Sequence, residues 1–244
     1  MITPRIPRTA LIVVLAASSL GTRTVCGGQE TASPASTVND HGVFLLSVGG
    51  RPAGTETFDI RSIGDRVEAE AKIELLIEQE GKVRQFKNAP KLVLNSTLQP
   101  LTYAWSQKSP QSSQLEVDFR ASPAKARYRT VAGGNDHLDF ALPKDVVVLD
   151  YNVIHHYQLL VDRYRRTAGG KQAFRAFVPQ EATPGSLEVE EVGLESVEID
   201  GRVQTLRHLV VTTELSRIDL WVDDQQRLSR LSSPAAQLEV VRKR

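Results

Sequence analysis

The sequence predicts a mainly β protein: a curled antiparallel β-roll or half-barrel with one amphipathic α-helix packed on it. Two observations predict this fold. Apolar and charged residues alternate along many short segments separated by glycine, proline, aspartate and asparagine, as in half-buried strands. Only the segment near 150–166 has the 3.6-residue period of a helix. Long antiparallel strands joined by tight turns twist, so we expect them to curl around one apolar face.

The first residues have the order of a secretory signal peptide, which we place at 1–21. Arg5 and Arg8 precede the apolar run 10–20, and small residues follow it, so that cleavage after Ser19 or Gly21 is expected. The run is too short to span a bilayer, which takes ~20 apolar residues. We therefore expect an exported protein, periplasmic or extracellular, without a transmembrane segment after cleavage. An uncleaved membrane anchor is the alternative.

Composition and charge fit one globular domain. The chain has 244 residues, of which 41% are hydrophobic and 24% charged, with a net charge of +1 that falls to about −1 when 1–21 is removed. The absence of a basic field excludes nucleic acid as the expected partner. The small polar residues of 22–40 predict a flexible leader, and 41–244 is predicted to form a single β-roll domain.

Cys26 is the only cysteine, which excludes an intramolecular disulfide and a cysteine metal cluster. It follows the apolar run, where a lipid anchor is conceivable. However, the residues before it do not resemble the bacterial lipidation motif, which has a small residue directly before the cysteine. A free thiol is the favoured interpretation, and lipidation stays the alternative.

Eight strands are predicted before the helix. They lie at 41–50, 55–63, 66–79, 83–95, 101–107, 114–120, 124–131 and 137–142. The segment 66–79 has the composition of a helix, but its apolar residues alternate with charged ones, and we interpret it as a strand. Pro90 interrupts 83–95, which indicates an edge strand or a bulge because proline donates no backbone hydrogen bond.

The predicted helix, 150–166, begins with Asp150 as N-cap and ends before Gly169 and Gly170. Its apolar stripe consists of Val153, Ile154, Tyr157, Leu160, Val161 and Tyr164. This spacing predicts that the stripe packs on the sheet, that His155 faces water and that His156 lies on the flank.

Six more strands are predicted after the helix. They lie at 172–178, 186–199, 202–213, 216–222, 227–232 and 237–242. Asp200 and Gly201 form a strong two-residue hairpin signal.

The order of these motifs resembles a family of exported bacterial β-roll proteins of unknown function. The motifs are a Gly-Arg-Pro-Ala-Gly hairpin at 50–54, a meander, one helix with an aromatic–histidine run, the Gly-Arg hairpin at 200–202, and Leu-Trp-Val-Asp at 220–223. The resemblance covers 41–242. It implies a rolled β-sheet and an exported location but no activity. Such rolls are loosely similar in shape to the half-barrels that carry lipoproteins or lipids across the periplasm.

The adjacent pair His155 and His156 is the most conspicuous candidate for metal chemistry. Neighbouring helix residues point ~100° apart, whereas one metal ion on a helix takes residues at i and i+4. A third ligand would have to come from His137, His208 or Asp162. We therefore interpret the pair as hydrogen-bonding histidines, and expect no metal and no cofactor.

Catalytic motifs give no support for an enzyme. The sequence contains no Gly-x-Ser-x-Gly elbow. Glu190 and Glu191 are neighbours on a predicted strand and face opposite ways, and Asp223 and Asp224 are typical of a turn. The expectation is a non-enzymatic protein.

The candidate ligand site is a set of large aromatic residues. These are Tyr103, Trp105, Tyr157, Tyr164 and Trp221. They are typical of core packing, but they could also line a cavity between the curled sheet and the helix. Apolar cavities with a few polar groups bind small hydrophobic molecules.

Three functions follow from these observations. The first is an envelope protein that binds a lipid, another hydrophobic ligand or an envelope protein partner in that cavity. The second is a histidine-based metal protein or hydrolase. The third is a structural or assembly factor that acts through its edge strands.

Overall fold

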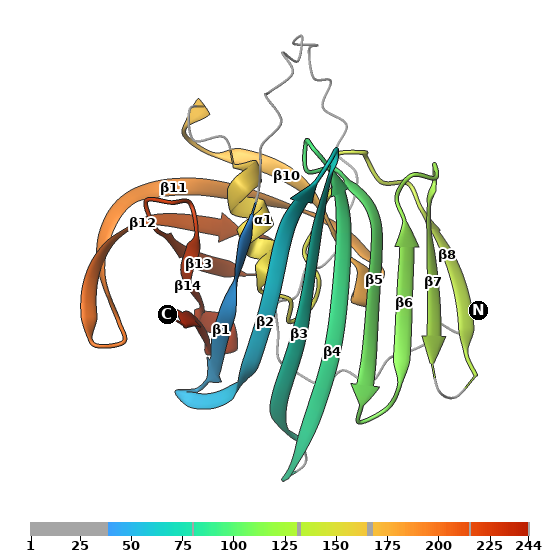
Figure 1. Cartoon of the computed structure of the whole chain (residues 1–244), viewed down its shortest axis with the longest axis horizontal. Helices are drawn as coiled ribbons and strands as arrows, with labels where there is room; N and C mark the ends of the chain where they lie inside the picture. Colours follow the sequence, from blue (N-terminus) through green and yellow to red (C-terminus); the bar gives the residue numbers. More distant parts are fainter. Residues whose placement is uncertain (1–38, 80, 131–132, 165–167, 215, 244) are drawn as a thin grey trace.

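The computed structural model describes residues 39–79, 81–130, 133–164, 168–214 and 216–243. All the strands of this part of the chain belong to one sheet of fifteen strands, and it contains one α-helix, α1 (Figure 1). The sheet is curled, and α1 lies between its β1–β5 part and its β10–β14 part. The predicted fold class, a curled mainly β roll with one helix, is confirmed.

The first half of the chain forms a meander. Its strands are β1 (Asp40–Val48), β2 (Arg51–Ile63), β3 (Arg66–Gln79), β4 (Lys82–Asn95), β5 (Pro100–Ser109), β6 (Ser113–Asp118), β7 (Ala124–Thr130) and β8 (Asn135–Phe140). Each of them pairs antiparallel with the next.

The second half begins with β9 (Val147–Val148) and α1 (His155–Arg163), and a second meander follows. Its strands are β10 (Gln172–Val178), β11 (Thr183–Ile199), β12 (Arg202–Thr212), β13 (Arg217–Val222), β14 (Leu228–Ser233) and β15 (Leu238–Lys243). The two-residue strand β9, which pairs parallel with β10, was not predicted.

The two meanders join at their outer strands. β1 pairs antiparallel with β15, from Val43 opposite Lys243 to Val48 opposite Leu238. The order of the sheet therefore runs from β8 through β1 and β15 to β9, and the described chain starts and ends in the middle of the sheet.

Side chains close the roll between its two ends. The rings of Phe140 and Phe177 lie 4.8 Å apart, and Phe119 meets Phe177 edge-on at 6.2 Å. The Tyr128 hydroxyl donates a 2.9 Å hydrogen bond to the Pro179 carbonyl oxygen. The first and the second meander thus meet in one continuous apolar core.

Alternation explains the strands that were predicted. In β3, the apolar residues Val67, Ala69, Ala71, Ile73 and Leu75 are buried, while the residues between them are more exposed. The strand interpretation of 66–79 is therefore confirmed. At the hairpin between β11 and β12, Asp200 and Gly201 have φ angles of 51° and 72°, as a type I′ turn requires.

Pro90 does not mark an edge. β4 lies between β3 and β5 in the sheet. The pairing of β3 with β4 passes from Glu70–Lys91 to Ile73–Asn88, so that Pro90 falls in a gap of this ladder. The ladder accommodates a residue without an N–H group by leaving out its bonds locally.

The helix departs most from expectation, because it spans His155–Arg163 and not 150–166. Its N-cap is Ile154, whose side chain makes no capping bond, and Asp150 lies outside the helix. All residues from His155 to Val161 are buried, since the roll encloses the helix. The expectation that His155 faces water was therefore wrong.

In the described part of the chain, no helix has both the length and the apolar character that a membrane crossing requires.

Candidate functional site

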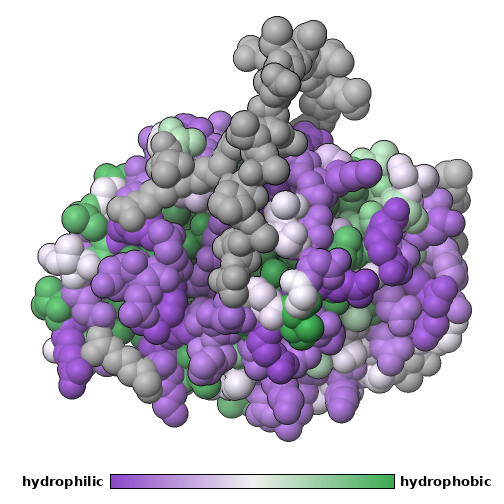
Figure 2. Space-filling view, turned by 45° about the horizontal axis from the view of Figure 1, so that its top comes forward, coloured by the Kyte–Doolittle hydropathy of each residue, from purple (hydrophilic) through white to green (hydrophobic). Residues whose placement is uncertain are grey.

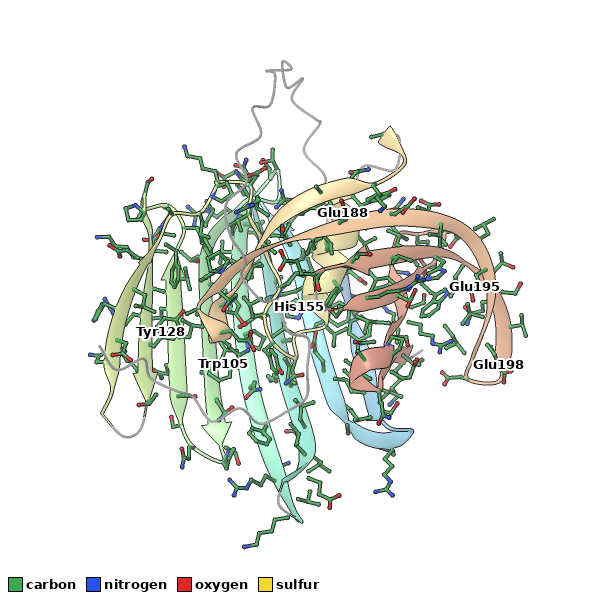
Figure 3. The ribbon with its side chains drawn as sticks, turned by 180° about the vertical axis from the view of Figure 1, so that it is seen from behind. Trp105, Tyr128, His155, Glu188, Glu195 and Glu198 are labelled. Atoms are coloured by element: carbon green, nitrogen blue, oxygen red, sulfur yellow. The ribbon has the colours of Figure 1, made fainter. Side chains whose placement is uncertain are left out.

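Buried polar side chains gather where α1 begins, in the interior of the roll. They are Glu56 of β2, Tyr103 of β5, Asp150, and the first two helix residues, His155 and His156. Figure 3 places His155 well inside the fold, between the two parts of the sheet. Polar groups in such an apolar setting are costly unless they are paired, so each contact in the cluster has a strong effect on stability.

Glu56 caps the helix from a distant strand. Its carboxylate accepts hydrogen bonds from the backbone N–H groups of Ile154, at 2.6 Å, and His155, at 2.7 Å. The Nδ1 atom of His155 lies 2.8 Å from the same carboxylate. The negative charge also suits the positive end of the helix dipole. Glu56 thereby performs the capping role that we had predicted for Asp150.

Asp150 instead links α1 to β5 and to the segment after β10. The Tyr103 hydroxyl donates to its carboxylate, and the backbone N–H of Gln180 donates to it at 2.9 Å. Burial raises the pKa of the Asp150 carboxyl to about 6, although these hydrogen bonds oppose the rise. Burial also raises the pKa of the Tyr103 hydroxyl well above its ordinary value.

The contacts assign the proton positions of the two imidazoles. The backbone N–H of Asp150 donates to Nδ1 of His156 at 3.1 Å, so a neutral His156 carries its proton on Nε2. Burial lowers the pKa of His156 well below its ordinary value, which favours this neutral form. In His155, Nδ1 faces the Glu56 carboxylate and is the protonated nitrogen.

Both Nε2 atoms are buried and have no hydrogen-bond partner. The two rings lie 4.8 Å apart, and each histidine is 0% exposed. One buried nitrogen on each imidazole thus remains unfilled at the start of the helix. Buried unfilled groups of this kind weaken the packing around them.

The candidate third metal ligands do not join the histidine pair. His137 is exposed on the edge strand β8, His208 contacts Glu195 and Asp219, and Asp162 lies two turns along α1. No group of three or more histidine, cysteine or acidic residues that could hold a metal ion occurs among the described residues.

Four of the five predicted aromatic ligand residues lie together in the main core, and one does not. Tyr103, Trp105, Tyr157 and Tyr164 belong to the cluster that contains α1. Trp221 belongs to a separate cluster with Val197, Ile199 and Leu206. There its Nε1 donates to Glu195 at 2.9 Å, and its ring stacks on His208. Placing Trp221 with the other four was wrong, because its position on β13 points to the opposite face of the sheet.

The interior beside the helix is filled. One cavity, with a volume of about 20 Å³, borders the residues from Leu149 to Ile154, and another, of about 10 Å³, borders Leu92, Leu159 and Arg163. A cavity of this size holds about one water molecule. The space that would receive a hydrophobic ligand is occupied by α1 and its side chains.

Sequence reasoning missed Glu56, although a signal for it exists. Glu56 has the same strand parity as Phe58 and Ile60, which face the core. A charged residue on the apolar face of a strand needs a buried partner. The partner itself could not be deduced, because it lies 99 residues further along the chain.

Fold and site together define a β-barrel-like domain with a buried helix. A solved structure similar to it is the β-barrel-like protein of domain of unknown function DUF1849 from Brucella abortus, with a TM-score of 0.57, 9% sequence identity, and coverage of 85% of this chain and 95% of that chain. A DUF1089 family protein from Pseudomonas aeruginosa covers the same shares at a TM-score of 0.43 and 12% identity, too low to support an argument. No protein-family model and no curated protein matches the chain. At these identities the likeness shows the fold alone.

Proposed function

We propose that this chain is a non-enzymatic exported protein of the bacterial cell envelope that binds a hydrophobic ligand, or an apolar segment of an envelope partner, inside the roll. The ligand takes the place that α1 occupies. The observation that supports this most is the way α1 is held. An open curled sheet encloses the helix, and buried, incompletely paired ionisable groups lie at its start. The signal-like sequence at 1–21 supports export.

Apart from the apolar packing of Tyr157, Leu160 and Val161 in the main core, further polar contacts hold α1. Gln158 accepts a hydrogen bond from the backbone of Leu228 at 2.6 Å and donates one to the Gln226 carbonyl oxygen at 2.9 Å. Arg163 donates to the Asp145 carbonyl oxygen at 2.7 Å. Water can replace each of these bonds when the helix moves outward, and the apolar wall of the sheet then becomes the binding surface.

The two alternative functions have less support. The histidine pair lacks a third ligand, as described above. For strand addition, the edge strand β8 carries Asp136, His137 and Asp139, and β9 has only two residues. Charged and very short edges oppose pairing with another chain.

Uptake of a neutral apolar dye, N-phenyl-1-naphthylamine, by the protein without residues 1–21 tests the proposal. We expect one saturable site in the wild type. In Glu56→Gln we expect several-fold tighter binding of the dye. Weaker contacts at the start of α1 lower the free energy needed to move the helix out of the site. The matched control is Glu74→Gln, a surface glutamate of β3 that pairs with Lys87, and it should bind like the wild type.

Two further measurements separate specific binding from loosened folding. Urea unfolding of Glu56→Gln should stay cooperative, and the dye should raise its midpoint, as a ligand of the folded state does. Native mass spectrometry of the protein purified from its host's envelope should show a lipid-sized mass that leaves on unfolding. Absence of saturable dye binding in both the folded wild type and Glu56→Gln would contradict the proposal.

A further inference from the structure

Arg207 of β12 is a buried arginine, and two of its three guanidinium nitrogens have no hydrogen-bond partner. The residue is 5% exposed. Its Nη1 lies 3.3 Å from Oε2 of Glu191 on β11. Its Nε and Nη2 atoms are buried and have no hydrogen-bond partner. Arginine stays charged at physiological pH, so two charged donors lie in the protein without an acceptor.

The unused atoms form the edge of the guanidinium that suits a carboxylate. Nε–H and Nη2–H point the same way, and together they match the two oxygens of a carboxylate. Other arginines of this chain bind a carboxylate through this edge. Arg120 contacts the two oxygens of Asp118 through Nε at 2.8 Å and Nη2 at 2.9 Å, and Arg230 contacts one oxygen of Glu239, Oε2, through the same two nitrogens at 3.0 and 2.9 Å. Arg207 has the same edge, but it lacks the carboxylate.

Arg207 lies between a buried and an exposed cross-strand neighbour. Across the strand pair on one side lies Val222 of β13, which is fully buried. Across the pair on the other side lies Leu194 of β11, which is 72% exposed. The register of β11 and β12 shifts between Glu191 and Gly193, so a bulge lies beside the arginine. The charged edge itself is buried, and the exposed Leu194 is its neighbour across the strand pair.

We propose that the Nε–Nη2 edge of Arg207 binds the carboxylate group of a small-molecule ligand. Glu191 contacts Nη1 and holds the guanidinium in place, while the Nε–Nη2 edge has no acceptor in the protein. The site does not require α1 to move, and so it goes beyond the proposed function. If both proposals hold, the ligand is an amphiphile with a carboxylate head at Arg207 and an apolar tail in the roll.

The test uses acetate, decanoate and decanol, the last as a neutral ligand with the same tail as decanoate. In the wild type, the NMR resonance of the Arg207 Nε–H group should shift downfield when a carboxylate is added. Decanoate should bind on the order of tenfold more tightly than decanol, because the charged hydrogen bonds are made only by the carboxylate. This measurement needs no mutation, and folding defects cannot confuse it.

A variant pair tests the geometry. Arg207→Lys keeps the positive charge beside Glu191 but lacks two parallel donors, so it should lose most of the preference for decanoate over decanol. Arg202→Lys, at an exposed position of the same strand, is the control and should keep the preference.

Each outcome decides the question. A shift with acetate supports a site for free small carboxylates, and a shift with decanoate alone supports an amphiphile. No shift with either, or equal affinity for decanoate and decanol, overturns the inference. Equal saturable binding of the two decyl ligands would still support the proposed function, whereas an acetate shift without dye binding would support Arg207 alone.

Discussion

Two buried residues at the start of α1, His156 and Asp150, change the stability of the fold with pH in opposite directions. The pKa of His156 is lowered by burial, so acidification below its ordinary value of 6.5 favours states in which the ring is exposed and charged. The pKa of Asp150 is raised to about 6, so its contribution to stability is complete below 3.8 and is lost as the pH rises through about 6. No single pH therefore gives the full stability contribution of both His156 and Asp150.

Asp162 provides the clearest test of this kind. Burial raises the pKa of its carboxyl from 3.8 to about 7, a hydrogen bond from Gln158 opposes the rise, and the Asp40 charge adds to it. Its Oδ2 atom has no partner. The stability from this group is present below pH 3.8 and is lost as the pH rises through about 7. Asp162→Asn should therefore be more stable than the wild type at pH 8, by roughly 1–2 kcal/mol.

Urea unfolding at pH 4.5 and pH 8 measures this difference. The gain should shrink at pH 4.5, where the wild-type carboxyl is mostly protonated. Asp139→Asn, on the exposed edge strand β8, serves as control and should show little change at either pH. A gain of equal size at both values would mean that the effect of Asp162→Asn is steric and not electrostatic.

At the scale of elements, β2 approaches the backbone of β3 closely at Gly54, where the β1–β2 pairing also changes register. The register of this pair shifts between Leu46 and Ser47, and Gly54 lies at the shift. A Cβ atom on Gly54 would lie 2.1 Å from the carbonyl oxygen of Glu74 on β3. The position therefore requires glycine for space, not only for its φ angle of 156°.

Gly54→Ala should cost about 3 kcal/mol or more of the free energy of unfolding, because backbone atoms of β3 must move. Gly64→Ala is the matched control. Gly64 has a φ of 63° and nothing within 4 Å of an added Cβ, so alanine there should cost only about 1 kcal/mol. Urea denaturation of the two variants gives the comparison. An equal loss of unfolding free energy in the two variants would show that the backbone of β3 moves easily beside Gly54.

The elements also show what the sequence could predict. Strands such as β3 and β10 were predicted with their exact bounds or nearly so, because alternation is a local pattern. The start of α1 was misplaced because its cap, Glu56, comes from another strand. The burial of His155 was missed for the same reason: a helix enclosed by a roll has no water-facing side, whatever its sequence period. The link between Tyr103 and Asp150 spans 47 residues and could not be predicted either.

On the scale of the whole molecule, the sheet order makes the described chain nearly circular. Arg242 of β15 binds the Asp40 carboxylate at the start of β1, with Nη1–Oδ2 and Nη2–Oδ1 distances of 2.9 and 2.5 Å. The connection that can be opened with least damage runs from β8 to β9, since these strands are the two ends of the sheet.

A circular permutant tests this arrangement. Residue 243 is joined to residue 39 by a short Gly/Ser linker, and the chain is opened at Pro143–Lys144. The variant should fold to the same roll, with a loss of no more than about 2 kcal/mol, because β15 and β1 already pair like a hairpin. Circular dichroism and the dispersion of amide NMR signals measure the outcome. An unfolded or aggregated permutant would show that the 141–146 connection is needed for folding.

The pairing of β1 with β15 also sets a waiting time during biosynthesis. Asp40 and Arg242 are 202 residues apart, and ribosomes add roughly 5–20 residues per second, so β1 is made roughly 10–40 s before its second neighbour. Through that interval, the strand at the centre of the finished sheet is an open edge of the nascent first meander. Holding chaperones that recognise extended chains would find their most persistent target there, at the strand that ends up best protected.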